Sequence, residues 1–590
     1  MCGIIGYIGM EPAAQILYGA LTRLEYRGYD SAGIATIDDD KIHVIKEKGK
    51  LGVIAQQCND KTLPGKAGIG HVRWATHGSA TKENAHPHCD NGEEIAVVHN
   101  GIIANHEELK SKLQSECSFR SETDTEVIPH LIRHYMDSGL SFEDAFFAMI
   151  RELNGSYAIL AICAAEPDKI VAARMDAPLV IGLGDGANFI GSDVLSFLPY
   201  TKKVIYLNEG EGAVITKENV KTYDGKHNEI THEPELVIWE WKEGNKGDYD
   251  YFMMKEIEEQ PRAIRQALLQ DDKVLMNMAK TICHARQVVF VACGTSRHAA
   301  LIGRYAFSKI GHIFSDVVMG SEFGYFSDSI DKGTVVIAIS QSGETADVLS
   351  GVREAKANGA TIYSLVNVVG SSLARLSDQV LYLNCGPEIA VAATKSFTAQ
   401  LCLSYQLAFA LDDRLHDGKS ELKDLSAVVE SDLEFNSESL PALAYKLRDK
   451  TDFYYLARGV NFAVADEGAL KLKEIAYVHA EGMPAGELKH GTLALIETGT
   501  PVIAICPLDY TYEDSMANLM EVKARGAHVV GVSNAQSMIF DDTIKISYCE
   551  EILYPLVTTI PLQLLAYYSA IARGINPDKP RNLAKSVTVK

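Results

Sequence analysis

The sequence lacks an excess of positive charge, and this absence argues against one large class of proteins. Lysine and arginine number 56 against 78 aspartate and glutamate residues, which gives a formal net charge of −22. Because nucleic-acid phosphates select for basic surfaces, we expect no nucleic-acid partner. Small anionic substrates remain possible, since a few local residues can override the overall charge.

The sequence also lacks closely spaced cysteines and a secretory leader. Its eleven cysteines include no CxxC pair and no close Cys/His spacing. We therefore expect the reduced thiols of a cytoplasmic protein, with no bound metal and no cofactor. The amino terminus has no basic n-region, which argues against a signal peptide. The most apolar stretch, residues 553–572, holds prolines and polar residues, so we expect a buried helix and no membrane association.

A chain of 590 residues is too long for a single hydrophobic core. Residues 2–240 alternate short strand-like runs with turn residues, and helical patterns cover Ala13–Leu24 and Thr125–Ser138. This pattern predicts a layered α+β domain with antiparallel sheets. A polar linker is predicted at 241–260, and a helical pattern covers Lys255–Leu269.

Further along the chain, apolar strands alternate with helices, which predicts parallel, doubly wound sheets. This half repeats itself: VFVACGTS, from Val289, is echoed by YYLARGVN, from Tyr454. Two further echoes follow in the same order at nearly the same spacing. We therefore predict two copies of one α/β subdomain, at 261–440 and 441–579, with a tail at 580–590.

Cys2 could act as a nucleophile if the initiator methionine is removed. Its thiol would attack, and its own α-amino group, with an ordinary pKa of about 8, could accept the proton. Taken alone, a cysteine at this position is more simply read as incidental.

Five motifs of the first domain favour the catalytic interpretation of Cys2. They resemble those of the N-terminal-nucleophile glutamine amidotransferases, whose hydrolase fold has αββα layers. In that family the cysteine forms a glutamyl thioester and releases ammonia. The resemblance implies that Asn100 and the Gly101 backbone stabilise the oxyanion. The motifs are EYRGYDSAG (25–33), HVRWATHG (71–78), NAHPH (84–88), VHNGIIANH (98–106) and SETDTE (121–126).

The same resemblance implies a glutamine pocket. Arg73 would hold the α-carboxylate through a two-pronged contact, and Asp124 would hold the α-ammonium group. Trp74 is similar to the family's ammonia gate, and Thr76 and His77 would complete the pocket. Arg27 would lie in a loop near the nucleophile. The histidines of NAHPH, His86 and His88, are better explained as structural or substrate-adjacent residues than as metal ligands.

Two loops of small hydroxyl residues, Cys293–Ser296 and Ser340–Thr345, stand between a strand and a helix. Such loops present backbone N–H groups and hydroxyls that suit a phosphate. Neither is a P-loop, because GK[ST] is missing. With the duplication, SQSGET resembles the sugar isomerase (SIS) fold, which binds phosphosugars. Ala393 stands where close relatives often have serine, which leaves only a backbone contact there. The implied sugar-phosphate residues are Cys293, Thr295, Ser296, Ser340, Gln341, Ser342, Thr345, Val391 and Ala393.

The segments EGALKLKEIAYVHAEGMPAGELKHG, from Glu467, and PRNLAKSVTVK, from Pro580, resemble the glucosamine-6-phosphate synthases. The resemblance implies that Glu474 moves a proton between C1 and C2 and that Lys471 assists at the sugar hydroxyls. It further implies that His490 of the neighbouring subunit helps to open the furanose ring and that Lys585 forms a Schiff base. Without the resemblance, Lys471 and Glu474 could be a helix salt bridge.

The expected activity is therefore synthesis of glucosamine 6-phosphate from glutamine and fructose 6-phosphate, by a homodimer with internal ammonia transfer. Two alternatives stay open. A glutaminase domain could be joined to a different synthase, as in amidophosphoribosyltransferase. A phosphosugar-binding regulator could retain SQSGET without activity, but it would not need Glu474, His490 and Lys585.

Overall fold

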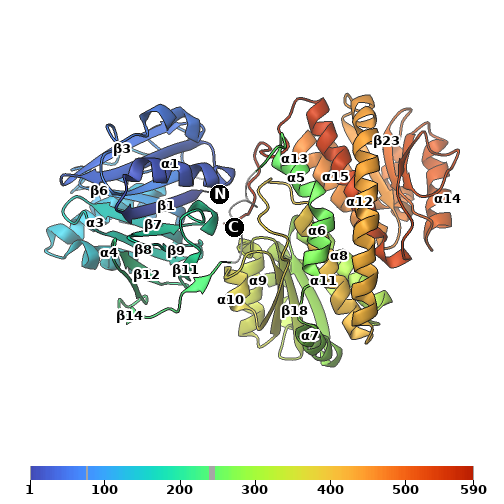
Figure 1. Ribbon diagram of the computed structural model, residues 1–590, viewed down its shortest axis with the longest axis horizontal. Helices are drawn as coiled ribbons and strands as arrows, with labels where there is room; N and C mark the ends of the chain where they lie inside the picture. Colours follow the sequence, from blue (N-terminus) through green and yellow to red (C-terminus); the bar gives the residue numbers. More distant parts are fainter. Residues whose placement is uncertain (1, 75–76, 238–245, 589–590) are drawn as a thin grey trace. The chain divides into compact units, whose positions relative to one another are not determined.

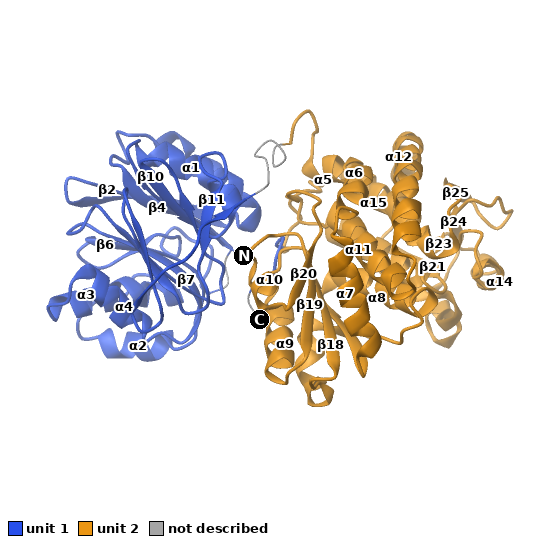
Figure 2. Ribbon diagram, turned by 60° about the horizontal axis from the view of Figure 1, so that its bottom comes forward, with its two compact units in different colours: residues 1–244, 584–590 blue, residues 245–583 orange. Residues whose placement is uncertain are grey.

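The computed structural model describes residues 2–74, 77–237 and 246–588. The chain forms two compact units, Met1–Gly244 with Ala584–Lys590, and Asn245–Leu583 (Figure 2). Much of the polar stretch that predicted the linker lies outside the described residues. Each unit has its own hydrophobic core.

The first unit contains two antiparallel sheets, shown in blue to green in Figure 1. Their facing sides share one apolar core, to which β1 contributes Ile4 and Ile8. One sheet has the order β15 (Glu235–Leu236), β11 (Lys203–Tyr206), β9 (Val180–Leu183), β10 (Ala187–Gly191), β1 (Gly3–Gly9), β4 (Ala67–Arg73), β2 (Ser31–Asp38), β3 (Lys41–Lys48). The other has the order β14 (Glu229–Ile230), β13 (Val220–Tyr223), β12 (Gly212–Ile215), β8 (Ile170–Met175), β7 (Gly155–Cys163), β6 (Ile95–Ile103), β5 (His88–Cys89).

Helices cover the outer faces of the two sheets. Helix α1 (Ala13–Leu24) packs on β1 and β4, where Gly3 and Gly70 leave no side chain to hold the helix away. A Cβ atom on either glycine would lie 2.9 Å from an α1 leucine. Helices α2 (His106–Leu113), α3 (Val127–Asp137) and α4 (Phe142–Ile150) share a second core with the other sheet. This arrangement confirms the predicted αββα layers.

The second unit contains two five-stranded parallel sheets with the same strand order. The glycines that follow their first strands, Gly294 and Gly459, have φ values of +54° and +56°. The predicted duplication is therefore confirmed. The first sheet has the order β17 (Asp316–Met319), β16 (Gln287–Ala292), β18 (Thr334–Ser340), β19 (Thr361–Val366), β20 (Gln379–Tyr382). The second has the order β22 (His479–Pro484), β21 (Asp452–Ala457), β23 (Pro501–Ile505), β24 (His528–Ser533), β25 (Asp542–Lys545).

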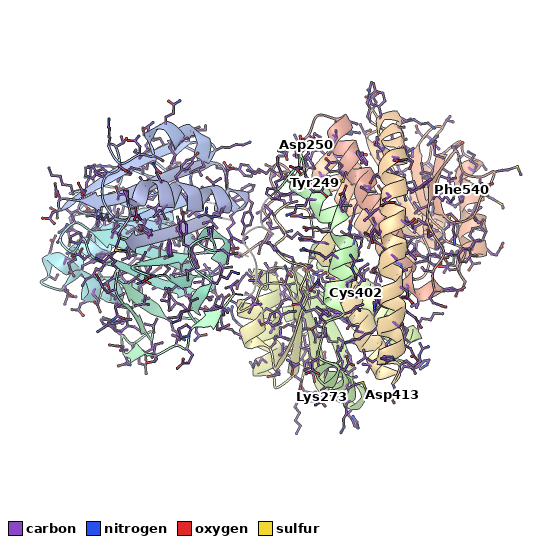
Figure 3. The ribbon with its side chains drawn as sticks, viewed as in Figure 1. Tyr249, Asp250, Lys273, Cys402, Asp413 and Phe540 are labelled. Atoms are coloured by element: carbon purple, nitrogen blue, oxygen red, sulfur yellow. The ribbon has the colours of Figure 1, made fainter. Side chains whose placement is uncertain are left out.

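Helices lie around and between these sheets (Figure 1). Cys402 is fully buried among them (Figure 3), and none of the eleven cysteines, all within the described residues, forms a disulfide bond. The segment Glu551–Ala572 is long and apolar enough to cross a membrane, but 83% of its apolar window is buried, as predicted for a core helix. The helices are α7 (Asp272–His284), α8 (Gly294–Lys309), α9 (Ala346–Ala357), α10 (Ser372–Leu376), α11 (Lys395–Leu411), α12 (Leu415–Lys446), α13 (Asn461–Ala476), α14 (Tyr512–Lys523) and α15 (Tyr554–Ala572).

The helix predicted at Lys255–Leu269 is two helices, α5 (Phe252–Glu258) and α6 (Gln260–Ala267). The reason is Pro261, which stands in the first turn of α6. Proline has no N–H to continue the hydrogen bonding of α5, and its ring clashes with the preceding turn. A periodic pattern of apolar residues does not register this break.

Candidate active sites

Cys2 lies immediately before β1, a central strand of the first sheet. Its Sγ atom accepts a hydrogen bond from the Trp74 amide at 3.3 Å and lies 3.4 Å from the Trp74 carbonyl oxygen. Antiparallel pairing of β1 with β4, with Gly3 opposite Val72, brings these residues together. Burial raises the pKa of the Cys2 thiol above its ordinary value, so this thiol needs a base before it can attack.

The second sheet supplies the groups that face Cys2. Asn100, on β6, donates its Nδ2–H to the Cys2 carbonyl oxygen at 3.1 Å. Gly101 follows with φ of +124°, and a Cβ atom there would lie 2.0 Å from the Ser156 carbonyl oxygen. Only glycine fits this backbone. The structure therefore brings the predicted nucleophile and the Asn100–Gly101 pair to one place.

Two side chains of opposite charge flank the thiol. Arg73, at the end of β4, and Asp124 both act electrostatically on Cys2. The Asp124 carboxylate accepts the Ile103 N–H at 2.7 Å, and both side chains are largely buried. The Arg73 guanidinium donates to carbonyl oxygens of the following loop, including that of Ser79 at 3.3 Å. An α-amino acid, with its carboxylate and ammonium group, complements this pair of charges.

The other predicted residues of this pocket are placed as follows. Trp74 is half-buried and packs edge-on against Tyr29. His77 is half-buried, whereas Thr76 lies outside the described residues. Arg27 belongs to a buried pair with Asp193 at 2.7 Å, which fixes the loop after α1.

In the second unit a buried charged cluster joins α13 to the start of α8. Lys471 Nζ lies 2.5 Å from a Glu474 oxygen and donates to Thr295 Oγ1 at 3.0 Å. Glu467 Oε1 lies 3.5 Å from the same ammonium group. Burial disfavours this charge, but Glu474 and Glu467 raise the pKa of Lys471 above its ordinary value. Lys471 is therefore a fixed cation next to Glu474.

Glu467 and His298 complete the cluster, and sequence reasoning missed both. Glu467 is fully buried, and it accepts from Thr295 Oγ1 at 3.1 Å and pairs with His298 Nδ1 at 2.7 Å. The sequence carried a signal, because Glu467, Lys471 and Glu474 recur at helical spacing and share one face of α13.

The two phosphate-binding candidates follow adjacent parallel strands, β16 and β18. In the Ser340–Thr345 loop, Ser340 Oγ accepts the Gly343 N–H at 3.0 Å and lies 3.1 Å from Thr345 Oγ1. In the other loop, Ser296 Oγ accepts from Gln400 at 3.0 Å. Carboxyl ends of parallel strands form the usual ligand edge of a doubly wound sheet. Cys293, Gln341 and Ser342 lie half-buried in these loops.

Four predicted residues lie elsewhere. Val391 is buried and its N–H donates to the Asp578 carbonyl at 3.1 Å, while Ala393 is half-buried. His490 is exposed at the end of a 3-10 helix, Ala485–His490. Lys585 is half-buried in the terminal segment that belongs to the first unit. Its place relative to Glu474 stays a prediction.

Comparison with known proteins assigns a domain family to each unit. A model of the SIS domain matches residues 281–410 and again 446–573, and a glutamine amidotransferase domain model matches 71–198. The glutamine–fructose-6-phosphate aminotransferase (isomerizing) of Thermococcus kodakarensis is 45% identical over the full length of both chains. That of Methanothermobacter thermautotrophicus is 46% identical, also over both full lengths. The chain belongs to the glutamine–fructose-6-phosphate aminotransferase (isomerizing) family.

Comparison with solved structures agrees with this family assignment. The carboxy-terminal domain of the glucosamine–fructose-6-phosphate aminotransferase of Francisella tularensis is 34% identical, with a TM-score of 0.53. It covers 57% of this chain and all of its own. Tagatose-6-phosphate ketose/aldose isomerase of Escherichia coli, 18% identical with a TM-score of 0.50, covers 57% of this chain and 96% of its own and shares the fold. The two SIS matches contradict a phosphoribosyltransferase half.

Proposed function

We propose that the chain makes glucosamine 6-phosphate and glutamate from fructose 6-phosphate and glutamine. The observation that carries this proposal is full-length similarity to aminotransferases of that name, together with a candidate site in each unit. A regulator without activity would not need a buried Lys471–Glu474 pair beside a phosphosugar fold. The substrates are glutamine and fructose 6-phosphate, and we propose a cytoplasmic homodimer, since the motifs of the whole family are present.

The glutaminase half-reaction follows from the first site. The Cys2 thiol adds to the glutamine γ-carbonyl carbon, and its proton passes to the Cys2 α-amino group. Negative charge then develops on the carbonyl oxygen, where Asn100 and the Gly101 N–H would donate hydrogen bonds. Collapse of this intermediate releases ammonia and leaves a thioester, which water hydrolyses to glutamate. Arg73 and Asp124 hold the two charged ends of the amino acid.

The synthase half-reaction is assigned to the second site and the tail. The SQSGET loop and the Thr295 loop bind the sugar phosphate, and His490 of the partner subunit assists ring opening. Lys585 condenses with the C2 carbonyl, with loss of water, and ammonia released at Cys2 then replaces the lysine nitrogen. Glu474 carries the proton between C1 and C2, and the fixed ammonium of Lys471 orients that carboxylate.

A two-variant assay tests this division of labour. Cys2→Ala should abolish glutamine-dependent synthesis but retain fructose 6-phosphate binding, because the nucleophile and the sugar site are in different units. Ser342→Ala should weaken fructose 6-phosphate binding and leave glutamine hydrolysis in the absence of sugar unchanged. A folded Cys2→Ala variant that no longer binds the sugar phosphate would contradict the assignment.

A further inference from the structure

Four buried histidines lie directly behind Asn100, and the reaction described above uses none of them. They come from β4 (His71), the loop before β5 (His86), β5 itself (His88) and β6 (His99). The rings of His71 and His86 stack with centroids 4.0 Å apart, and His86 meets His88 edge-on at 4.8 Å. Their exposed fractions are His71 0%, His86 4%, His88 3% and His99 2%. In the described part of the chain, no group of His, Cys, Asp and Glu side chains could hold a metal ion.

The backbone of β6 explains why imidazoles are needed here. Strand β6 pairs with β7 along its whole length, but on its other edge β5 reaches only Ala96 and Val97. The next peptide groups on that edge belong to His99. Its N–H donates to His86 Nδ1 at 3.3 Å, and its carbonyl oxygen lies 3.0 Å from His71 Nε2. Two imidazoles thus satisfy backbone groups that would otherwise be buried without partners.

These partners fix the proton on each ring. A carbonyl oxygen only accepts, so His71 carries hydrogen on Nε2, and His86 must keep the Nδ1 lone pair free for the His99 N–H. Both rings are neutral, because burial lowers the pKa of His71 to about 3 and that of His86 well below its ordinary value. Each ring is therefore fixed in one tautomer: His71 donates to the His99 carbonyl oxygen, and His86 accepts from the His99 N–H.

We propose that His71 and His86 are positioning residues for the oxyanion-binding strand: by holding the N–H and the carbonyl oxygen of His99, they set the next two residues, Asn100 and Gly101, against the reacting carbonyl. This inference rests on the proposed glutaminase activity. Transition-state donors work only if they are held in place beforehand, and a displacement of about 1 Å can lower the rate roughly 100-fold.

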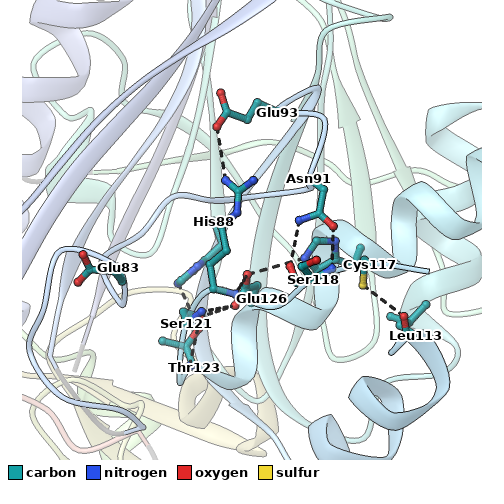
Figure 4. Close-up of polar contacts among 12 residues, drawn as sticks. Glu83, His88, Asn91, Glu93, Leu113, Cys117, Ser118, Ser121, Thr123 and Glu126 are labelled. Atoms are coloured by element: carbon teal, nitrogen blue, oxygen red, sulfur yellow. Dashed lines mark hydrogen bonds and ion pairs between the residues drawn. The ribbon is translucent and has the colours of Figure 1, made fainter. Parts of the chain in front are cut away.

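The same cluster reaches the turn that carries Asp124. The His99 ring is hydrogen-bonded to Thr125 Oγ1 at 2.9 Å, and the His88 ring is hydrogen-bonded to Thr123 Oγ1 at 3.2 Å. Figure 4 shows His88 with Thr123, and the Glu126 carboxylate that accepts from Ser121 at the start of this turn. The cluster therefore links the strand that stabilises the oxyanion to the turn that binds the substrate ammonium.

Paired substitutions in the full-length chain test the proposal. Gln at 71 can place an N–H near the position of Nε2, and Asn at 86 can place an oxygen near Nδ1, whereas Met and Leu can do neither. His71→Met and His86→Leu should lower kcat for glutamine hydrolysis by roughly 10- to 100-fold with KM changed less than about threefold. His71→Gln and His86→Asn should recover most of that loss. His43→Met, on the edge strand β3, is the matched control and should retain wild-type kcat.

The affinity for an aldehyde analogue of glutamine, compared with the affinity for glutamate, separates a positioning role from a general loss of stability. The aldehyde carbonyl forms a hemithioacetal with Cys2, and the thiol proton passes to the carbonyl oxygen that Asn100 and Gly101 would bind. Affinity for this analogue should fall in parallel with kcat in His71→Met and His86→Leu, while affinity for glutamate stays unchanged. Fructose 6-phosphate binding checks that the second unit is intact.

The outcomes separate the two proposals. Wild-type kcat in folded His71→Met and His86→Leu, or equal losses of aldehyde and glutamate affinity, would overturn the positioning role. If those two variants do not fold, His71→Gln decides, because a folded His71→Gln with a 100-fold loss of kcat would also overturn it. Glutamine hydrolysis that survives Cys2→Ala would instead overturn the proposed function.

Discussion

Acidification should destabilise the first unit well above the pH at which its carboxylates titrate, because His71 is buried in the neutral form. Its pKa is about 3 in the folded chain, against an ordinary value of 6.5. The unfolded chain therefore binds this proton first, and the stabilising contribution is full above pH 6.5 and is lost as the pH falls. Between pH 7 and pH 5, His71 alone accounts for a loss of roughly 2 kcal/mol in the free energy of unfolding.

Neighbouring groups act in the same direction but can be separated from His71. Burial also lowers the pKa of His86 and His88. Burial opposes the charge of Glu126, but the adjacent His130 and hydrogen bonds from the Arg120 amide and from Ser121 lower its pKa to about 2. Because an ordinary glutamate titrates near 4.5, Glu126 contributes mainly below pH 5. The interval from pH 7 to pH 5 therefore reports on the histidines.

Tryptophan fluorescence isolates this effect. None of the three tryptophans of the sequence falls within the second unit, Asn245–Leu583, so urea unfolding followed by tryptophan emission does not report on that unit. His71→Gln should reduce the loss between pH 7 and pH 5 by about 2 kcal/mol. His284→Gln, in α7 of the second unit, should leave it unchanged. An identical loss in wild type and His71→Gln would refute the reasoning.

Three further outcomes are expected. Active protein should begin at Cys2, because a retained Met1 blocks the amine that acts as base; full glutaminase activity in a chain whose intact mass includes Met1 would exclude this mechanism. Borohydride with fructose 6-phosphate should trap a sugar adduct at Lys585, and Lys585→Arg should abolish synthesis, since arginine cannot form the imine; near-normal synthesis by that variant would remove the covalent step. Glu474→Gln should lower synthesis about 100- to 10,000-fold and spare glutamine hydrolysis without sugar, as expected for an acid–base group; an undiminished rate would reassign the proton transfer.

The sequence predicted the layers of the first unit and the duplication in the second because both leave periodic traces. Helix α1 lies at its predicted bounds, Ala13–Leu24, and the helix predicted at Thr125–Ser138 is α3, Val127–Asp137. The break at Pro261 was missed because apolar periodicity continues across it. Cys2, Asn100 and Asp124 lie together as the family resemblance implied, although no local pattern connects them.

What the sequence did not predict depends on contacts across long separations. Glu467 was overlooked because its partners, Thr295 and His298, belong to the other repeat and lie about 170 positions away in the sequence. The proposed roles of His71 and His86 depend on where β5 stops pairing with β6, and a strand of only two residues, such as β5, has no reliable sequence signal.

Nitrogen transfer tests the central claim, that one chain couples glutamine hydrolysis at Cys2 to amination of fructose 6-phosphate. The full-length protein is given glutamine labelled with ¹⁵N at the amide, fructose 6-phosphate and an excess of unlabelled ammonium, and the product is analysed by mass spectrometry. Glucosamine 6-phosphate should carry ¹⁵N from the amide in nearly every molecule, because ammonia passes within the protein. Unlabelled product, or no glucosamine 6-phosphate at all, would contradict the account.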